Sequence, residues 1–364
     1  MRLVFGMAGI GTSVWAIIIP AAKIRFQLDD ATLGAILFIG GTGGLLAMPL
    51  AGVAIARWGS RRVLSMTGVG VAGLLPALTL VPNTLGFTVC LFLYGWVFGM
   101  LETSMNAQGA VVERRSGRLR MSGFHACFSL GGLGVALASA GLLRLGLTPA
   151  GCAGVSAAVI LLILTQTGQL IGKAGDTRPE GRHWAWPNRA ALVLGACCFA
   201  CFMTEGAATD WSTIFLHFSR GLSFAAATLG YAAFAVSMTI ARLFGDAVAT
   251  RLGQPWLMRL GTLLALLGFG LIIFVPRGAV DVLGFGLVGL GTGNIIPLVF
   301  SAAARVPGMQ AHQAVPVVVG LGYAGFLVGP VMIGLVANHL GLGTALGVDA
   351  ALLAATLLAA RAVA

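Results

Sequence analysis

The clearest candidate for chemistry in this sequence is an acid that lies one helical turn from an amide. Glu102 and Asn106 both fall inside an apolar run that predicts a helix over 85–108. Because residues four apart share one face of a helix, we expect the carboxyl and the amide to line the same cavity. Burial disfavours the charged carboxylate, so Glu102 could take up and release a proton as its surroundings change. The alternative is a carboxyl that hydrogen-bonds to a neighbouring helix.

A second pair of acids, Glu205 and Asp210, lies in the apolar run 190–216. A spacing of five residues places them about 140° apart around a helix, so they cannot line one site equally. Glu205 is the deeper of the two and is the candidate for contact with a proton or a substrate. Asp210 is nearer the predicted outer end, where we expect it to fix a gate by hydrogen bonding.

Further polar and aromatic side chains lie inside apolar runs. His125 in the run 121–143 suits a proton relay because histidine titrates near neutral pH, although a hydrogen bond between helices is an equal alternative. Trp15 and Trp211 could stack on the apolar face of a sugar, and Asn294 could hydrogen-bond to it. Packing against lipid or neighbouring helices is the alternative for these three residues.

The composition indicates that lipid surrounds these runs. Of 364 residues, 58% are hydrophobic and 9% are charged, whereas a soluble domain carries roughly 25% charged residues. The runs are continuous and about 20 residues long, which is typical of membrane-spanning helices and excludes the alternating pattern of a membrane barrel. The sequence therefore predicts an all-α membrane protein with twelve transmembrane helices. The predicted spans are 3–22, 32–56, 63–82, 85–108, 121–143, 149–171, 190–216, 224–248, 257–276, 280–303, 315–337 and 343–360.

The spans form two related halves. The longest polar stretch, 172–189, separates six spans in 1–171 from six in 190–364. Gly99 and Glu102 recur as Gly291 and Asn294 at an offset of 192 residues. Two six-helix pseudo-repeats in parallel orientation predict a substrate site at the midplane between them.

The basic residues predict the orientation. With a cytoplasmic N-terminus, the cytoplasmic ends of the spans hold 17 Lys and Arg residues and the outer ends hold 5. Cytoplasmic loops of membrane proteins are enriched in basic residues. Both termini and the central linker are therefore predicted to be cytoplasmic.

The loop after the second span carries a family pattern. It reads Gly52-Val-Ala-Ile-Ala56-Arg57-Trp-Gly59-Ser-Arg61-Arg62. The sequence here resembles the major facilitator superfamily of secondary transporters, whose pattern is Gly, three residues, Asp, Arg or Lys, any residue, Gly, Arg, and Arg or Lys. Ala56 occupies the acidic position, and the second half echoes the pattern from Arg242 to Gly253 with an acid at Asp246. The resemblance implies a gating role for Arg57, Arg61, Arg62, Arg242 and Asp246.

Within the superfamily, the fourth span most resembles the fucose-permease type of sugar:proton symporter. The residues that carry this resemblance are Glu102, the string Met105-Asn106-Ala-Gln108, and Glu113. In that type a carboxylate in the fourth span handles the coupled proton, and Glu102 is the matching position. The partner acid of the first span is absent here. The resemblance implies a proton-coupled transporter whose two halves rock about the site.

The remaining sequence narrows the function. We find no metalloprotease, hydrolase or phosphate-binding motif, so we expect neither an enzyme nor an ATP-driven pump, and no cofactor, metal or nucleic-acid partner. No Lys or Arg is predicted at mid-membrane depth, which favours a neutral or cationic solute, with a sugar-like solute preferred. We expect a monomer in the bacterial inner membrane whose partners are a small solute, protons and lipid.

Two alternatives remain open. One is a proton-driven exporter of the same fold, although 121–143 lacks the proline of the Gly-Pro motif that such exporters carry. The other is a solute receptor that does not transport.

Overall fold

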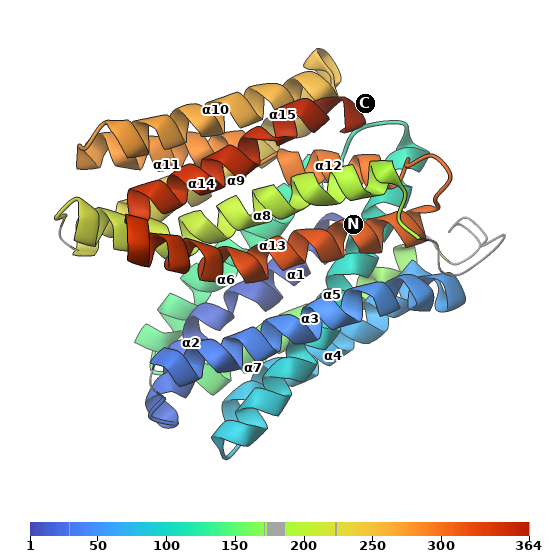
Figure 1. The fold of residues 1–364 in the computed structure, drawn as a ribbon. Helices are drawn as coiled ribbons and strands as arrows, with labels where there is room; N and C mark the ends of the chain where they lie inside the picture. The colour runs from blue at the N-terminus through green and yellow to red at the C-terminus, as the bar shows by residue number, and fades with distance from the viewer. Residues whose placement is uncertain (29, 171, 173–185, 223, 364) are drawn as a thin grey trace. The chain divides into compact units, whose positions relative to one another are not determined.

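The computed structural model describes residues 1–28, 30–170, 172, 186–222 and 224–363 (Figure 1). Every regular element in this part of the chain is helical, which confirms the predicted all-α fold. The α-helices of the N-terminal part are α1 (Arg2–Ser13), α2 (Trp15–Arg25), α3 (Asp30–Trp58), α4 (Ser60–Leu80), α5 (Thr84–Ser116), α6 (Met121–Arg144) and α7 (Pro149–Leu164). Those of the C-terminal part are α8 (Arg189–Ile214), α9 (Phe224–Leu252), α10 (Gln254–Phe274), α11 (Gly278–Thr292), α12 (Ile295–Ala303), α13 (Ala311–Leu340), α14 (Leu342–Ala354) and α15 (Thr356–Ala359).

Three short helical segments extend these elements. They are the 3-10 turns η1 (Thr165–Gln169) and η4 (Ala360–Val363) and the π-helical segment η3 (Phe215–Ser219). Eleven helices in the described residues are long and apolar enough to cross a membrane. The remaining predicted span, the first, is formed by α1 and α2, which join at Val14 in a right-handed helical conformation. All twelve predicted spans are therefore represented.

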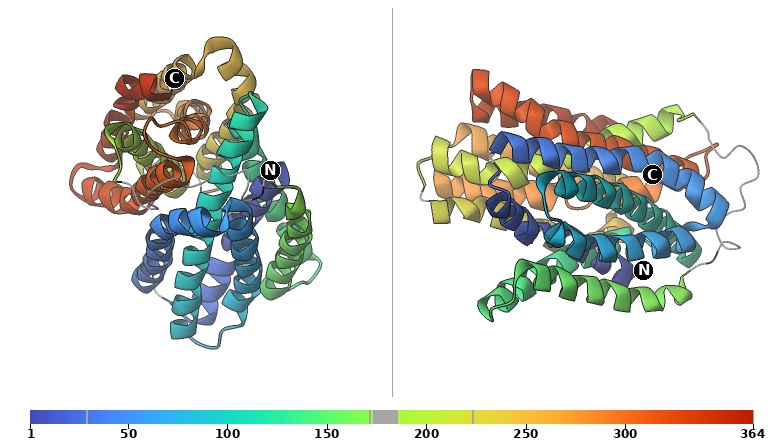
Figure 2. Two further views of the ribbon diagram at one scale, coloured as in Figure 1. Left: turned by 90° about the vertical axis from the view of Figure 1, so that its right-hand side faces the viewer. Right: turned by 90° about the horizontal axis from the view of Figure 1, so that it is seen from below.

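The contacts divide the chain into two compact units. Unit 1 comprises Met1–Ser116, Cys127–Ala185 and Gln310–Pro316, and unit 2 comprises Gly117–Ala126, Trp186–Met309 and Val317–Ala364. Helices α3, α4, α5 and α7 lie side by side in unit 1, as do α8, α10, α11 and α14 in unit 2 (Figures 1 and 2). The predicted division into 1–171, 172–189 and 190–364 stays a prediction, because most of the linker lies outside the described residues.

The internal repeat is visible in the helix lengths. Helices α3 and α9 both have 29 residues, and the helices that follow them, α4 and α10, both have 21. Each pair is joined by one glycine, Gly59 or Gly253, with φ near 85° and ψ near 148°. Side chains other than glycine rarely adopt this backbone conformation, so the same residue makes the same turn in both halves.

Glycines also allow the helices of unit 1 to pack closely. A methyl group at Gly95 or Gly99 of α5 would collide with the backbone of Gly40 or Gly44 of α3. Small residues four apart on facing helices permit such close approach, which is a common way for helices to associate in membranes. The spacing therefore fixes how α3 packs on the helix that carries Glu102 and Asn106.

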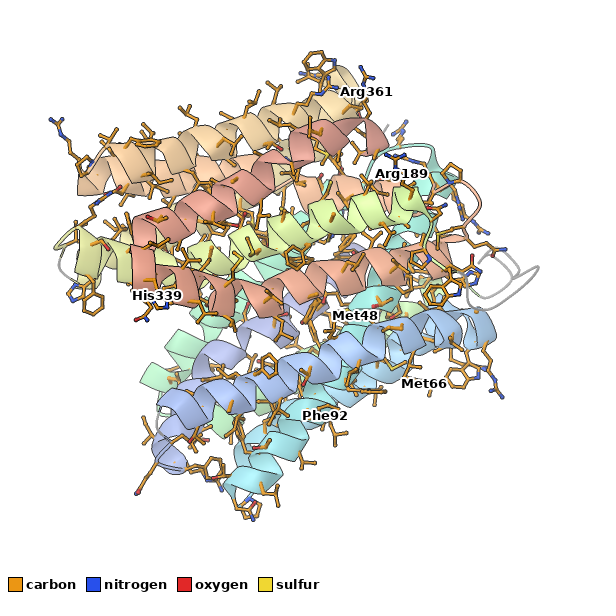
Figure 3. All side chains as sticks on the ribbon, viewed as in Figure 1. Met48, Met66, Phe92, Arg189, His339 and Arg361 are labelled. Atoms are coloured by element: carbon orange, nitrogen blue, oxygen red, sulfur yellow. The ribbon has the colours of Figure 1, made fainter. Side chains whose placement is uncertain are left out.

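The outward-facing side chains of the helices are largely apolar (Figure 3). Met66 on α4 is 59% exposed and Phe274 on α10 is 80% exposed. Figure 3 also shows Arg189 and Arg361 at one end of the unit 2 helices and His339 at the other. The two arginines are assigned to the same side by the predicted topology.

The predicted orientation can be tested by reporter fusions. A reporter of cytoplasmic location placed after Ala364 or within 172–189 should be active, and one placed at Arg277 between α10 and α11 should be inactive. The reciprocal pattern from a reporter of external location provides the control. An external location for either the linker or the C-terminus would contradict the topology.

Candidate functional site

A break in one membrane-spanning helix organises the polar groups of unit 2. Helix α11 ends at Thr292 and α12 begins at Ile295, with Asn294 preceding its first turn. Pro297 lies in the first turn of α12 and has no backbone N–H, so it cannot donate to the carbonyl of Gly293 four residues earlier. In an apolar environment such a carbonyl needs another donor.

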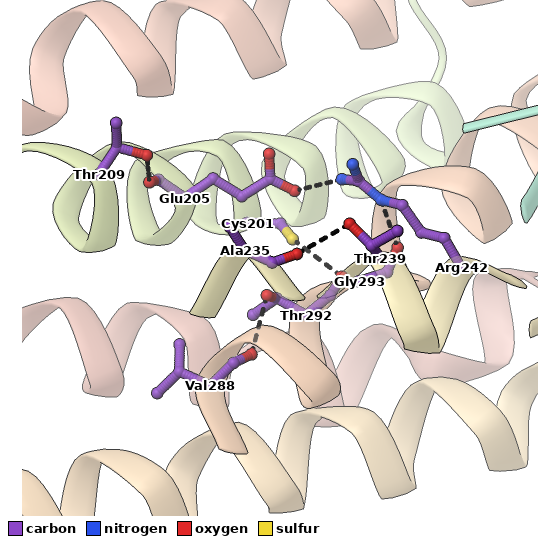
Figure 4. A network of polar contacts seen from close by, with 9 residues as sticks. All are labelled: Cys201, Glu205, Thr209, Ala235, Thr239, Arg242, Val288, Thr292 and Gly293. Atoms are coloured by element: carbon purple, nitrogen blue, oxygen red, sulfur yellow. Dashed lines mark hydrogen bonds and ion pairs between the residues drawn. The ribbon is translucent and has the colours of Figure 1, made fainter. Parts of the chain in front are cut away.

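That donor is Arg242 of α9, which is also paired with an acid (Figure 4). Its Nε donates to the Gly293 carbonyl at 3.1 Å, and its Nη2 donates to Oε1 of Glu205 on α8 at 2.9 Å. The side chains are 7% and 17% exposed, so the ion pair is largely buried. One guanidinium therefore joins α8, α9 and the break between α11 and α12.

Smaller polar contacts complete this arrangement (Figure 4). The thiol of Cys201, one turn before Glu205, donates to the Thr292 carbonyl at 3.7 Å. The hydroxyls of Thr239 and Thr292 donate to carbonyls within their own helices. Both carbonyls at the end of α11, those of Thr292 and Gly293, thus accept hydrogen bonds from side chains of neighbouring helices.

This geometry differs from the position expected for Arg242. From the sequence, Arg242 is expected at the cytoplasmic end of its span, with no basic residue deeper in the membrane. In the structure Arg242 is buried ten residues before the end of α9, or about 15 Å along the helix. Its charge is balanced by Glu205, the residue expected from the sequence to contact a proton or substrate.

The acid and amide of the fourth span lie on α5 in unit 1. Glu102 is 8% exposed and Asn106 is fully buried. The Asn106 side-chain nitrogen donates to the Glu102 carbonyl at 2.9 Å, and its Oδ1 has no hydrogen-bond partner among the described residues. A buried amide oxygen without a donor is able to accept one from a solute or water.

Asn294 and His125 both lie in unit 2 and are buried. Asn294 Nδ2 donates to the Ala241 carbonyl at 2.9 Å, and its Oδ1 has no partner among the described residues. The His125 ring lies 5.7 Å from the ring of Phe300 on α12. Both side chains therefore adjoin the broken helix.

The other residues assigned to substrate contact and to the outer gate have few polar contacts among the described residues. The Trp211 ring packs near Gly334 of α13, and its Nε1 is buried without a partner among the described residues. Asp210 is exposed and forms no hydrogen bond with them, so the structure supplies no gate contact for it. The side chain of Trp15 lies outside the described part.

The gating candidates adopt two different environments. In unit 1, Arg57 and Arg62 are exposed and Arg61 is half-buried at the turn between α3 and α4. In unit 2, Asp246 of α9 accepts the backbone N–H groups of Ser122 and Gly123 at 3.0 and 2.8 Å. A carboxylate at a helix N-terminus satisfies otherwise unpaired N–H groups and the helix dipole, so Asp246 caps α6.

Several buried polar residues were missed by sequence reasoning. Asp281 of α11 pairs with Arg220 at 3.0 Å, and Asp349 of α14 lies within hydrogen-bond distance of Thr204 at 3.1 Å. Both acids were visible in the sequence as carboxyls inside predicted spans, as was Pro297. No group of three or more metal-ligating side chains occurs among the described residues.

The comparisons with known proteins concern nearly the whole chain. A sequence profile of the Major Facilitator Superfamily matches residues 3–330. An uncharacterised transporter of the major facilitator type from Yersinia pestis is 38% identical over 100% of this chain and 94% of its own length. The membrane protein MosC of Rhizobium meliloti is 32% identical over 94% of this chain and 84% of its own length.

Solved structures are similar in fold at low sequence identity. The Escherichia coli fucose:proton symporter FucP matches with a TM-score of 0.84 at 16% identity, covering 100% of this chain and 97% of its own. The proton:xylose symporter XylE matches with a TM-score of 0.79 at 13% identity, covering 98% and 93%. These matches share the arrangement of helices.

The buried ion pair predicts a large loss of stability on truncation. Arg242→Gln leaves the Glu205 carboxylate buried without its cation and the Gly293 carbonyl without its donor. We expect the free energy of unfolding to fall by about 3–5 kcal/mol. Thermal or denaturant unfolding in detergent measures this, and Glu205→Gln combined with Arg242→Gln should cost less than the sum of the single changes.

Arg251→Gln is the matched control because this arginine is exposed at the end of the same helix. It should change the free energy of unfolding by no more than about 0.5 kcal/mol. An Arg242→Gln protein as stable as Arg251→Gln would show that the ion pair does not hold the broken helix.

Removing the carboxylate that caps α6 is expected to cost less stability than breaking the ion pair. Asp246→Ala should lower the free energy of unfolding by about 0.5–2 kcal/mol, because two backbone N–H groups lose their acceptor. Asp246→Asn keeps one acceptor oxygen and should cost less. Asp210→Asn alters an exposed acid on α8 and serves as the reference. If Asp246→Ala unfolds at the same denaturant concentration as this reference, the cap does not stabilise the fold.

Proposed function

Because the chain belongs to the major facilitator superfamily, we propose that it is a secondary transporter of a small neutral or cationic solute, sugar-like by preference, driven by protons. The proposal extends the family assignment in two respects, the chemistry of the solute and the source of energy. The residues described above supply a separate argument for each.

The observation that carries the solute assignment is a set of buried polar atoms without protein partners. Among the described residues these include Oδ1 of Asn106 in unit 1 and Nε1 of Trp211 in unit 2. Oδ1 of Asn294 instead lies against Gly245 of α9. Leaving such atoms unsatisfied costs about 1–3 kcal/mol each, so a ligand or water that satisfies them is favoured. Solute hydroxyl groups donate to amide oxygens and accept from an indole N–H, which suits a sugar.

The charge balance supports a neutral solute. Arg242 would attract an anion if it were alone, but its ion pair with Glu205 cancels the charge. The sequence predicts no basic residue deep in a span, which favours a neutral or cationic solute. Arg242 is basic and buried, but its pairing with Glu205 leads to the same expectation.

Proton coupling rests on Glu102. This carboxyl is buried on a long membrane-spanning helix, and an ionisable group there is costly unless it has a functional or structural role. Two proteins with a similar fold are sugar:proton symporters, which makes the same kind of energy coupling a natural choice for this chain. His125 and Glu205 remain further candidates for proton handling.

The setting proposed for this activity is the inner membrane of a bacterium, with both termini cytoplasmic and a monomer as the working unit. Bacterial relatives and the distribution of basic residues support this setting. Protons, the solute and the surrounding lipid are then the only partners required.

Transport assays with Glu102→Gln test the function. Purified protein in proteoliposomes should exchange labelled fucose or xylose by counterflow, and an inward proton gradient should drive accumulation. Glutamine retains the shape of Glu102 but cannot titrate. The variant should therefore keep counterflow and lose at least about 90% of gradient-driven accumulation, which corresponds to a tenfold change.

Arg251→Gln is the control, since it removes an exposed charge at the end of α9 and should preserve both activities. Accumulation by Glu102→Gln at the wild-type level would remove Glu102 from the coupling mechanism. Gradient-driven extrusion of a cationic dye without sugar counterflow would indicate an exporter. A thermal shift with sugar but no counterflow would indicate a receptor.

A further inference from the structure

Another buried carboxyl of unit 2 lies apart from the ion pairs. Asp349 of α14 is fully buried. Its Oδ1 lies 3.1 Å from the hydroxyl oxygen of Thr204 on α8, and its Oδ2 has no hydrogen-bond partner among the described residues. Asp349 thus hydrogen-bonds to α8 through a single hydroxyl.

The hydroxyl of Thr204 has a second short contact that bears on where the proton lies. Its oxygen is also 3.0 Å from the carbonyl oxygen of Ala200, one turn earlier on α8. A threonine hydroxyl has one hydrogen, so it cannot donate to both the carbonyl and a carboxylate. If the carboxyl of Asp349 is protonated, it donates to Thr204 and Thr204 donates to Ala200. Both short contacts are then hydrogen bonds.

The surroundings of Asp349 provide no compensating cation. Helix α14 packs against α8, α10, α15 and η3, and it directly follows α13, whose titratable groups are His312, Tyr323 and, ten residues before Asp349, His339. The titratable or charged groups on the first four elements are Arg189, Cys197, Cys198, Cys201, Glu205 and Asp210 on α8, Arg259 on α10 and His217 on η3, while α15 has none. No cation within the described residues forms an ion pair with Asp349.

The basic groups among these are distant or engaged elsewhere. His217 is 13 residues beyond Thr204, or about 20 Å along the helix, and its Nδ1 contacts the Leu222 carbonyl at 2.7 Å. Arg259 lies against the Trp256 ring near the start of α10. Ile273 of α10 lies beside Gly347 of α14, two residues before Asp349. Arg259 is 14 residues before Ile273 on α10 and is therefore far from Asp349.

Asp281 shows what a buried ionised aspartate requires in the same unit. It is also fully buried, but the guanidinium Nε of Arg220 donates to its Oδ2 at 3.0 Å. An isolated carboxylate in an apolar interior is so unfavourable that the group takes up a proton instead. The two aspartates are equally buried, but Asp281 has a guanidinium beside it and Asp349 has only a hydroxyl.

We propose that Asp349 is a proton-binding site, in which the neutral carboxylic acid donates to Thr204 and thereby holds α14 against α8. Loss of the proton turns the Thr204 hydroxyl from the Ala200 carbonyl to the carboxylate, and it places a new negative charge beside the turn of α8 that carries Glu205. Only the use of this proton in transport rests on the proposed function. Binding of the proton itself requires no solute.

Infrared spectroscopy of the wild-type protein tests the protonation directly. The C=O stretch of a protonated carboxyl is separate from the bands of carboxylates, so Asp349→Asn should remove one such component. Asp281→Asn is the matched control and should leave it unchanged, because its carboxyl is ionised. Thr204→Val should shift the Asp349 component, because the carboxyl loses its acceptor. Identical protonated-carboxyl bands in wild type and Asp349→Asn would overturn the proposal.

The pH dependence of unfolding gives a second measurement. The folded protein retains the proton of Asp349, whereas an aspartate in the unfolded chain is ionised at neutral pH, so the wild-type free energy of unfolding should fall as pH rises. Asp349→Asn should show a smaller decline, and Asp281→Asn should retain the decline of the wild type. Parallel pH curves for wild type and Asp349→Asn would contradict the proposal. Neither measurement involves a solute or a gradient, so both stay informative if transport proves independent of protons.

Discussion

In a lipid environment every backbone N–H and C=O must find a partner within the protein, and this constraint governs the polar interior of unit 2. Pro297 leaves the Gly293 carbonyl without its usual donor, and the guanidinium of Arg242 takes that role. An arginine in the interior then requires an acid, and Glu205 provides it at 2.9 Å. The ion pair is thus best understood as a consequence of the broken helix, with any role in transport added to it.

The buried acids of unit 2 show three solutions to the same electrostatic cost. Glu205 shares an arginine with a backbone carbonyl, and Asp281 has an arginine of its own that also donates to the carbonyl of Ile272. Asp349 has a hydroxyl and, on our interpretation, a proton. An ion pair ties an acid to its charge, whereas a hydroxyl contact leaves the protonation free to change. Proton exchange is therefore favoured at Asp349 over Asp281.

The sequence was sufficient for the fold because apolar runs about 20 residues long can only be membrane-spanning helices, and charged residues mark their ends. The same rule counted Arg242, which lies inside the predicted span 224–248, with the basic residues at the cytoplasmic end of that span, because charges usually mark the ends of spans. Hydropathy carries no information about which helices face each other, so the pairing of Arg242 with Glu205 was out of reach. Pro297 and Asp349 were legible in the sequence as exceptions within apolar runs, and a closer inspection of those exceptions would have found both. The proximity of Glu102 and Asn106 could be predicted from their spacing alone, because residues four apart on one helix share a face whatever the tertiary structure.

The repeat gives the broken helix an evolutionary meaning. The offset of 194 residues that relates Gly59 to Gly253 pairs Arg242 with Met48, a fully buried methionine of α3 that Figure 3 labels. The offset of 192 pairs Pro297 with Met105, within the uninterrupted helix α5. The first half therefore lacks both the proline and the arginine, and it has no carbonyl that needs an external donor at this point. Ancestral duplication followed by divergence would have to gain or lose these residues jointly, so positions 242 and 297 should covary among homologues while 48 and 105 drift independently among apolar types.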